Sequence, residues 1–307
     1  MIVVTGASGF IGRALTEELL RRGERVVAVS RSSEVPEGAE RVIHDIRKPL
    51  VMEGNVEAVV HLAAKAATQY SFEAEWDTFE SNVLSTINMA RFALEKRALF
   101  ILASSAEVYG VVDSPSTWFS ENECICNRVP SSPYASSKIS AEVVARHYAL
   151  RGLRVAALRP TNTYGRLLFV RNKDAKSYFV EKAICMMLSG VSELLFEGFG
   201  DSMRQWMYYP DHLSAYLTVL YKSEPRPFEV YNVAGPKPAS LKEVIEVLAR
   251  VIGWRGVVRW GLKPRLVDPN FLLLDTSKLR SLGWRPQYDV VEGLSDYVNK
   301  INKIGCP

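Results

Sequence analysis

A glycine-rich turn at the start of the chain restricts the fold more than any other feature. Residues 5–12 read Thr-Gly-Ala-Ser-Gly-Phe-Ile-Gly and stand between an apolar run at residues 2–4 and an amphipathic stretch at residues 11–22. Such a turn needs glycine where φ is positive and where the backbone must touch a pyrophosphate without a Cβ in the way. The N–H groups at the start of the following helix then face the phosphates. The pattern predicts a dinucleotide site made by Gly6, Ser8, Gly9, Phe10, Ile11 and Gly12.

The first half of the chain continues this strand–helix alternation. Apolar runs rich in Val, Ile and Leu, typical of parallel strands covered on both faces, occupy residues 25–29, 41–44, 58–62, 99–103 and 154–158. Amphipathic stretches at residues 75–96 and 134–150 lie between them. We therefore predict an α/β fold with a Rossmann-type, doubly wound parallel sheet.

After residue 159 the pattern becomes more irregular. Helical periodicity covers residues 175–188 and 211–221, a strand pattern covers 229–233, and Ser240 is placed to cap a helix that ends near Gly253. We predict that residues 1–165 bind the dinucleotide and that residues 207–234 return to this domain. Residues 166–206 and 235–307 are expected to form a smaller, partly interleaved α/β substrate domain.

Charge and composition exclude several partner classes. The 38 Lys and Arg residues against 34 Asp and Glu give a net charge of +4 with no long basic run, so we predict no nucleic-acid partner. No stretch approaches the roughly 18 apolar residues that span a bilayer, and no secretory leader is visible. We predict no membrane association and a cytoplasmic location. The four cysteines and four histidines have no ligand spacing, so we predict no metal site.

The end of the second predicted strand bears on the cofactor. A carboxylate at this point binds the ribose 2′-hydroxyl of NAD, whereas arginine suits the 2′-phosphate of NADP. The chain has Ser30, Arg31 and Ser32 there, with no carboxylate before Glu34. We predict NADP(H), with NAD as the alternative if these residues form only a solvated loop.

A phenol and an amine stand one helical turn apart at Tyr134 and Lys138, after a Ser-Pro helix start. Ser105 follows a predicted strand, at the sheet edge where reacting groups gather in open α/β folds. A second pair with the same spacing, Tyr178 and Lys182, has no such context. We interpret that second pair as ordinary helix surface or core.

These three residues suit the removal of hydrogen from an alcohol. A tyrosine becomes a base near neutral pH only if nearby positive charge, from Lys138 and an oxidised nicotinamide, lowers its pKa by about three units, or roughly 4 kcal/mol. Tyr134 would then take the hydroxyl proton while hydride leaves the same carbon. Ser105 would hold the oxygen, and Lys138 would also anchor the nicotinamide ribose.

With these motifs on the page, the chain resembles the extended short-chain dehydrogenases/reductases of the NAD-dependent epimerase/dehydratase family, which act on nucleotide sugars. Besides the glycine turn and the Tyr134/Lys138 pair, the resemblance rests on residues 45–46, 61–64, Asn82, 104–110, 159–165, Arg204, Asn232, Arg265, 268–269 and 282–286. It implies cofactor contacts from Asp45, Ile46, Leu62, Ala63, Ala64 and Asn82. It also implies that Asn162, Arg204 and Arg265 contact the substrate diphosphate, and that residues 75–96 and 134–150 form a homodimer through a four-helix bundle.

Several positions depart from the family pattern. Ser30 and Arg31 replace an acidic residue, Gln205 follows Arg204 where Asp is usual, and Arg166 stands where proline is common. Members that dehydrate or decarboxylate tend to carry an acid at the position of Ala106, and this chain keeps only Glu107 as a candidate catalytic carboxylate.

We therefore predict a nucleotide-sugar 4-epimerase of the UDP-glucose/UDP-galactose type, working through a transient 4-keto intermediate. The alternatives are a nucleotide-sugar 4,6-dehydratase, an NADPH-dependent 4-keto-sugar reductase, and a catalytically silent NADP-binding scaffold.

Overall fold

The computed structural model describes residues 1–32, 34–110, 117–125, 128–170, 178–224, 227–261 and 271–305. Within these ranges seven parallel strands form a central sheet in the order β12-β7-β5-β4-β1-β2-β3. This order and direction confirm the predicted Rossmann-type α/β fold. The strands are β1 (Ile2–Thr5), β2 (Val26–Ser30), β3 (Glu40–Ile43), β4 (Ala58–His61), β5 (Leu99–Ala103), β7 (Arg154–Pro160) and β12 (Phe228–Val233).

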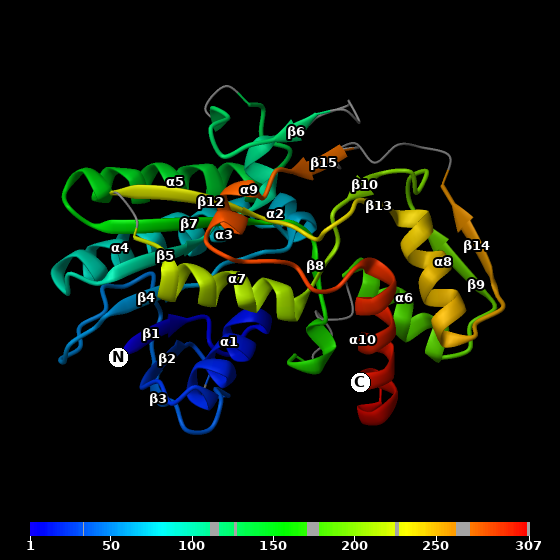
Figure 1. The fold of residues 1–307 in the computed structure, drawn as a ribbon, viewed down its shortest axis with the longest axis horizontal. Coiled ribbons are helices and arrows are strands. Elements are labelled where there is room, and N and C mark those ends of the chain that lie inside the picture. The colour runs from blue at the N-terminus through cyan, green and yellow to red at the C-terminus, as the bar shows by residue number, and fades with distance from the viewer. Residues whose placement is uncertain are drawn as a thin grey trace.

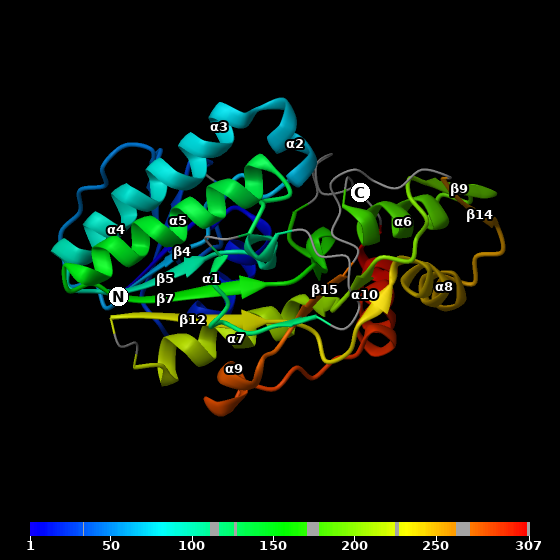
Figure 2. The same cartoon turned by 90° about the horizontal axis from the view of Figure 1, so that it is seen from above.

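Helices cover both faces of this sheet, as Figures 1 and 2 show. Helices α1 (Phe10–Arg21) and α7 (Tyr209–Lys222) pack on one face, and α4 (Ser85–Glu95) and α5 (Pro133–Leu150) pack on the other. All residues of β1, β2 and β4 are buried, because each strand presents side chains to a helical layer on either side. This explains why their sequences are continuous apolar runs rather than alternating ones.

The helical stretch predicted at residues 75–96 contains an unexpected π turn. It is divided into α3 (Glu75–Phe79), η1 (Glu80–Leu84) and α4, and a short α2 (Thr68–Glu73) precedes it. The buried Asn82 lies in the π turn, where its Oδ1 accepts from the Lys65 N–H at 2.7 Å and its Nδ2 donates to the Lys65 carbonyl at 3.1 Å. The same Nδ2 also donates to Ser137 Oγ at 2.9 Å, which ties the segment after β4 to α5. The expectation of one regular helix is wrong here, because the π turn contains an inserted residue and so changes the direction of the Asn82 side-chain amide.

Most of the remaining elements form a smaller part at the right of Figure 1, whereas β6 and α9 are drawn above the large sheet. A four-stranded sheet has the order β13-β10-β15-β6, and two-stranded sheets pair β11 with β8 and β14 with β9. The strands are β6 (Trp118–Phe119), β8 (Thr163–Tyr164), β9 (Glu193–Phe196), β10 (Met203–Arg204), β11 (Met207–Tyr208), β13 (Ala239–Ser240), β14 (Val257–Trp260) and β15 (Phe271–Leu274). The helices are α6 (Phe179–Leu188), α8 (Leu241–Ile252), α9 (Ser277–Ser281) and α10 (Val290–Ile304).

The predicted cap of α8 is present. Ser240 accepts from the Glu243 N–H at 3.1 Å, the Glu243 carboxylate accepts from the Ser240 N–H at 2.6 Å, and Gly253 ends the helix with φ 76°. These two residues therefore fix the start and the end of α8.

The chain crosses between the two parts more than once. After β10, α7 returns to pack against α1, and β12 pairs with β7 at the edge of the large sheet. Strands β8 and β11 pair in parallel where the two parts join. In the ranges described, no helix combines the length and the apolar character that crossing a membrane requires.

Candidate functional site

The predicted site residues gather along one edge of the sheet. Because all seven strands are parallel, the segments that follow them meet at their carboxyl ends. The glycine turn follows β1, residues 30–32 end and follow β2, residues 45–46 follow β3, residues 62–64 follow β4, Ser105 follows β5, and Asn162 follows β7.

The glycine turn has the geometry that a pyrophosphate needs. Gly6 has φ 70°, and a Cβ at this position would lie 2.8 Å from the Ala63 nitrogen. A Cβ at Gly12 would lie 2.1 Å from the Gly6 carbonyl oxygen, so neither glycine can be replaced without a backbone shift. No side chain caps α1 at Gly9, and the first turn carries no acid. The open helix end therefore fits the phosphates of a dinucleotide.

Hydroxyl groups and cations meet beyond the end of β2. Ser30 Oγ lies 2.7 Å from Ser8 Oγ and accepts from the Ser32 N–H at 3.0 Å. Arg13, which the sequence analysis missed, donates from Nη2 to the Glu34 carbonyl at 2.8 Å. Its buried Nε has no hydrogen-bond partner in the part of the chain that the structure describes. The sequence feature that could have identified Arg13 is its position in the first turn of α1, directly after Gly12.

The acid at the end of β3, Asp45, is already paired. Asp45 accepts from Arg47 Nη2 at 2.6 Å, and these hydrogen bonds, with a smaller contribution from Arg31, lower the pKa of Asp45 to about 2. On the neighbouring residue, the Ile46 carbonyl accepts from Asn88 at 3.0 Å. Asp45 is therefore ionised and held by Arg47 at the end of β3.

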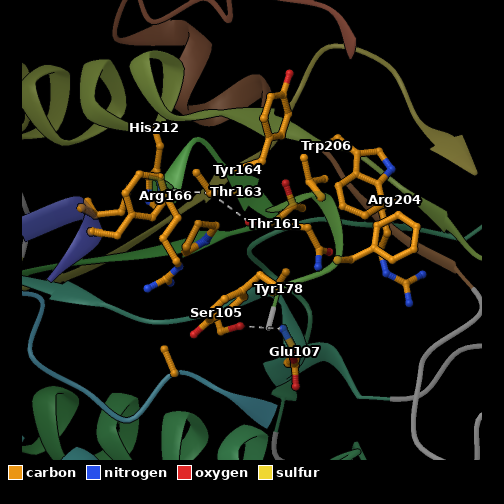
Figure 3. A pocket seen from close by; sticks show the side chains of 18 of the residues that line it. Ser105, Glu107, Thr161, Thr163, Tyr164, Arg166, Tyr178, Arg204, Trp206 and His212 are labelled. Atoms are coloured by element: carbon orange, nitrogen blue, oxygen red, sulfur yellow. Dashed lines mark hydrogen bonds between the residues drawn. The ribbon is translucent and has the colours of Figure 1, made fainter. Parts of the chain in front are cut away.

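A cavity of about 240 Å³ lies between the sheet edge and the smaller part of the chain, and Figure 3 shows the side chains around it. Seven predicted site residues line it, namely Phe10, Ile11, Ser105, Glu107, Tyr134, Asn162 and Arg204. Lys138 is not in its wall but lies behind Tyr134, and Arg265 falls outside the described residues. The structure thus brings the predicted serine, tyrosine and carboxylate to one cavity.

The serine, tyrosine and lysine are close together. The Ser105 side chain lies near enough to the Tyr134 phenol to lower its pKa, and Lys138 Nζ lies 5.8 Å from the centre of the Tyr134 ring. Lys138 Nζ also donates to the Ala103 carbonyl at the end of β5, at 2.7 Å. Helix α5, begun by Ser132 as N-cap and Pro133 in its first turn, fixes the phenol and the amine relative to the sheet edge.

Burial dominates the protonation of this group. It raises the pKa of Tyr134, with smaller contributions from Glu107 and Tyr178, and the hydrogen bond from Ser105 opposes them. Burial also lowers the pKa of Lys138 to about 8. The expectation that cationic neighbours favour the phenolate is therefore not met by Lys138 alone. Formation of the phenolate also requires a second positive charge, which an oxidised nicotinamide carries.

Glu107 lies in the same cavity wall and is held by two hydroxyl groups. Thr68 Oγ1 donates to its Oε1 at 2.9 Å and Ser132 Oγ donates to its Oε2 at 3.4 Å. Its backbone N–H donates to Ser105 Oγ at 3.2 Å. Since η2 (Ala106–Tyr109) begins at Ser105, the short helix fixes serine and carboxylate together.

A buried ion pair supports the site from behind. Arg159 Nη2 donates to Glu142 Oε2 at 2.7 Å, both side chains are 2% exposed, and Arg159 Nη1 donates to Tyr109 Oη at 2.8 Å. Tyr109 in turn donates to Asn232 Oδ1 at 2.7 Å. Glu142 stands one helical turn beyond Lys138, so the pair links α5 to β7 and β12.

The departure at Gln205 also has a structural reason. Its Oε1 accepts from the Leu274 N–H at 2.6 Å, and its Nε2 donates to the Gly235 carbonyl at 3.2 Å. An amide supplies both an acceptor and a donor, whereas an ionised carboxylate only accepts. Gln205 therefore joins β10 to β15 just after Arg204.

Three further residues line the cavity and were not predicted as site residues. They are Arg166, Tyr178 and His212. The interpretation of Tyr178 as ordinary helix surface or core is wrong, because Tyr178 precedes α6 and lies in the cavity wall. Burial lowers the pKa of His212 to about 3, so its ring is neutral; Nδ1 lies 3.0 Å from Thr163 Oγ1, and Nε2 has no partner among the described residues. Only Arg166 gave a signal, as a departure from the usual proline.

Comparison with known proteins gives matches along the whole chain. Residues 2–234 match the family profile described as "NAD dependent epimerase/dehydratase family". A Methanocaldococcus jannaschii protein named "Putative UDP-glucose 4-epimerase" is 31% identical over 97% of both chains. UDP-glucuronic acid decarboxylase 1 of Arabidopsis thaliana is 29% identical over 98% of this chain and 70% of its own length. The structure of MoeE5 in complex with UDP-glucuronic acid and NAD has a TM-score of 0.86 and 27% identity over 99% of both chains.

Proposed function

The chain belongs to the NAD-dependent epimerase/dehydratase family of extended short-chain dehydrogenases/reductases, and we propose that within it the protein is a nucleotide-sugar 4-epimerase. The family makes it an NAD(P)-dependent enzyme that acts on nucleotide sugars. The observation that carries the narrower proposal is a cavity wall that brings Ser105 and Tyr134 together and has Ala106, not an acid, directly after the serine. UDP-glucose and UDP-galactose are the first pair to test.

We propose a role for each of these residues. Ser105 holds the sugar O4 by hydrogen bond, and Tyr134 takes the O4 proton as hydride leaves C4. A nicotinamide dinucleotide, when bound, would supply the acceptor and the donor of hydride for C4. The 4-keto sugar turns in the cavity while Asn162 and Arg204 hold the diphosphate, and Arg265 is proposed to join them. Tyr134 then returns its proton to O4 as hydride returns to the opposite face of C4, which inverts that carbon and restores the enzyme.

Lys138 and Glu107 complete the proposed set. Lys138 lies behind Tyr134 and is placed to hold the nicotinamide ribose and to keep positive charge near the phenol. Glu107 has no step in 4-epimerisation, and its place in the cavity favours a second candidate, a nucleotide-sugar 4,6-dehydratase, in which a carboxylate moves protons at C5 and C6.

Product analysis separates the candidates. We expect the purified protein to interconvert a pair of UDP-hexoses, read by NMR, with no net consumption of added cofactor. Release of water with a 4-keto-6-deoxy product would identify a dehydratase, and stoichiometric use of NADPH would identify a 4-keto-sugar reductase. The variant Tyr134→Phe should lose activity by about 10²- to 10⁴-fold. The matched control is Tyr148→Phe, which lies on the same helix but outside the cavity wall. If Tyr134→Phe loses no activity relative to this control, the protein is a binding scaffold and not a Tyr134-dependent enzyme.

For the cofactor we propose NADP, with NAD as the alternative. Ser8, Ser30 and Ser32 offer hydroxyl or N–H donors beside the cations Arg13 and Arg31, and Asp45 is paired with Arg47. The proposed cofactor contacts also include the remaining residues of the glycine turn, Ile46, residues 62–64 and Asn82. Extraction and mass spectrometry of the co-purified dinucleotide tests this choice. Recovery of NAD alone would overturn it.

We also propose the predicted domain division and a homodimer. Residues 1–165 and 207–234 form the dinucleotide domain, and residues 166–206 and 235–307 form the substrate domain. The helices expected to pair across a dimer carry exposed apolar side chains, with Val143 57% and Leu150 85% exposed on α5. Sedimentation velocity should give the mass of two chains. A monomer at micromolar concentration would refute the dimer, and the cytoplasmic location stays a prediction.

A further inference from the structure

Arg166 is a cation held at the cavity wall by aromatic rings. It begins η4 (Arg166–Leu168), directly after β8 and the left-handed Gly165. Its guanidinium carbon lies 3.9 Å from the centre of the Tyr178 ring and 5.2 Å from the centre of the Phe10 ring. Stacking of this kind uses the faces of the guanidinium and leaves its N–H groups directed outward in the plane. The rings therefore orient an arginine whose donors remain available.

No carboxylate in the described ranges forms an ion pair with Arg166. Glu181 is the nearest candidate along the fold, but its Oε1 accepts from the backbone N–H groups of Gly165 and Arg166 at 3.0 and 3.1 Å. It also accepts from the Tyr297 hydroxyl at 3.3 Å. Glu181 thus holds the turn that carries Arg166, and its charge acts on the guanidinium only from a distance, without an ion pair.

The two cations of the described cavity wall stand on opposite sides. Figure 3 shows Arg204 beside Trp206, whereas Arg166 reaches in on the side of Ser105. If Arg204 holds the diphosphate, as proposed above, Arg166 lies toward the far end of the substrate, where the sugar meets the reacting groups. Glu107 also lines the cavity, so an anionic group could enter only if a cation compensated the repulsion.

We propose that Arg166 pairs with a carboxylate on C5 of the sugar, so that the preferred substrate is a nucleotide hexuronate and not a neutral hexose. This inference rests on the proposed epimerase function and narrows its substrate class. A hexose with a hydroxymethyl group at C5 would leave the guanidinium desolvated and without an anion. A hexuronate places two oxygens where a planar, forked donor can bind both. The cofactor pyrophosphate is a second anion in reach of this side, but the glycine turn and the open end of α1 already provide its donors.

The test compares UDP-glucuronate with UDP-glucose on the holoenzyme, for both binding and turnover. We expect wild type to bind UDP-glucuronate at least about tenfold more tightly and to epimerise it with higher kcat/KM. Arg166→Gln should lower affinity and kcat/KM for UDP-glucuronate by roughly 10- to 100-fold and change those for UDP-glucose less than about threefold. For UDP-glucuronate, the affinity and kcat/KM of Arg166→Lys should lie between those of wild type and Arg166→Gln, because lysine keeps the charge but lacks the two parallel N–H donors of arginine.

The matched control is Arg151→Gln. Arg151 also stacks on an aromatic ring, at 5.3 Å from the centre of Tyr148, but it lies outside the cavity. This variant should leave both affinities unchanged. Cofactor content, measured after denaturation, should equal that of wild type in Arg166→Gln.

Each other outcome has a distinct meaning. Equal wild-type affinity for the two sugars, or an equal loss for both in Arg166→Gln, overturns the carboxylate pairing. Loss of bound cofactor in that variant assigns Arg166 to the cofactor and also overturns it. If neither sugar is turned over while UDP-glucuronate binds more tightly through Arg166, the carboxylate pairing stands and the proposed 4-epimerase reaction fails.

Discussion

Replacement of Lys138 by methionine should stabilise the fold while it removes activity. The ammonium is 5% exposed, and burial lowers its pKa from the ordinary 10.5 to about 8. At neutral pH the folded chain therefore holds a charge that the unfolded chain carries more easily. A difference of this size corresponds to about 3 kcal/mol of stability. Methionine removes that penalty but leaves the Ala103 carbonyl without its donor, which costs about 1–3 kcal/mol.

The sign of the effect depends on pH. Because the pKa is lower in the folded than in the unfolded state, the penalty is complete below about pH 8 and disappears as pH rises toward 10.5. Lys138→Met should thus be as stable as wild type or more stable, by up to about 2 kcal/mol, at pH 7. Between pH 7 and pH 9.5 wild type should gain about 2 kcal/mol relative to the variant.

Urea unfolding of cofactor-free protein at these two pH values is the assay, since bound cofactor would stabilise wild type separately. The control is Lys182→Met, which removes an exposed lysine at the same spacing from Tyr178 and should show no such pH trend. A Lys138→Met variant more than 2 kcal/mol less stable than wild type at pH 7 would refute the reasoning. So would a stability difference that stays constant between the two pH values.

Three other substitutions test separate parts of the structure. Gly12→Ala places a Cβ 2.1 Å from the Gly6 carbonyl oxygen and should abolish dinucleotide retention, measured as cofactor recovered per chain; normal retention would contradict the tight-turn geometry. Arg159→Met leaves Glu142 buried without its partner and should cost about 3–5 kcal/mol in urea unfolding, with much of the loss recovered when Glu142→Gln is added. Arg31→Asp should shift cofactor affinity from NADP toward NAD by at least about tenfold in fluorescence titration, and an unchanged ratio would remove Arg31 from the 2′-phosphate site.

The parts of the fold that the sequence predicts well are those set by local rules. The sequence patterns identified all seven strands of the large sheet except for one or two residues at their ends, and they are clearest in β1, β2, β4 and β5, because burial on both faces leaves no alternation to confuse the pattern. Parallel direction then placed the ends of those strands at one edge. Ser105, Glu107, Tyr134 and Asn162 were brought together by that rule and by the spacing on α5.

The parts that were missed depend on contacts between distant segments. Strands β8, β10, β11 and β13 have two residues each, too few for any periodicity, and they exist because chain segments far apart in sequence pair with them. The π turn at Asn82 is set by hydrogen bonds to Lys65 and Ser137, which no local pattern encodes. Tyr178 was misread for the same reason, since its position in the cavity wall follows from where α6 packs.

In the cavity Tyr134 is a neutral phenol, which is the form that donates a proton to O4 in the second half of the proposed reaction. Burial and Glu107 favour the neutral phenol, so the base needed for the first half must be produced by positive charge nearby, in part from Lys138. Lys138 loses its proton near pH 8, and above this pH one of those charges disappears. We therefore expect kcat/KM to fall as pH rises through about 8, although deprotonation of a free tyrosine would make it rise. A profile that stays flat or increases between pH 8 and pH 10 would show that Lys138 does not supply charge to the phenol. The Lys138→Met variant, whatever its residual rate, should lack this decline.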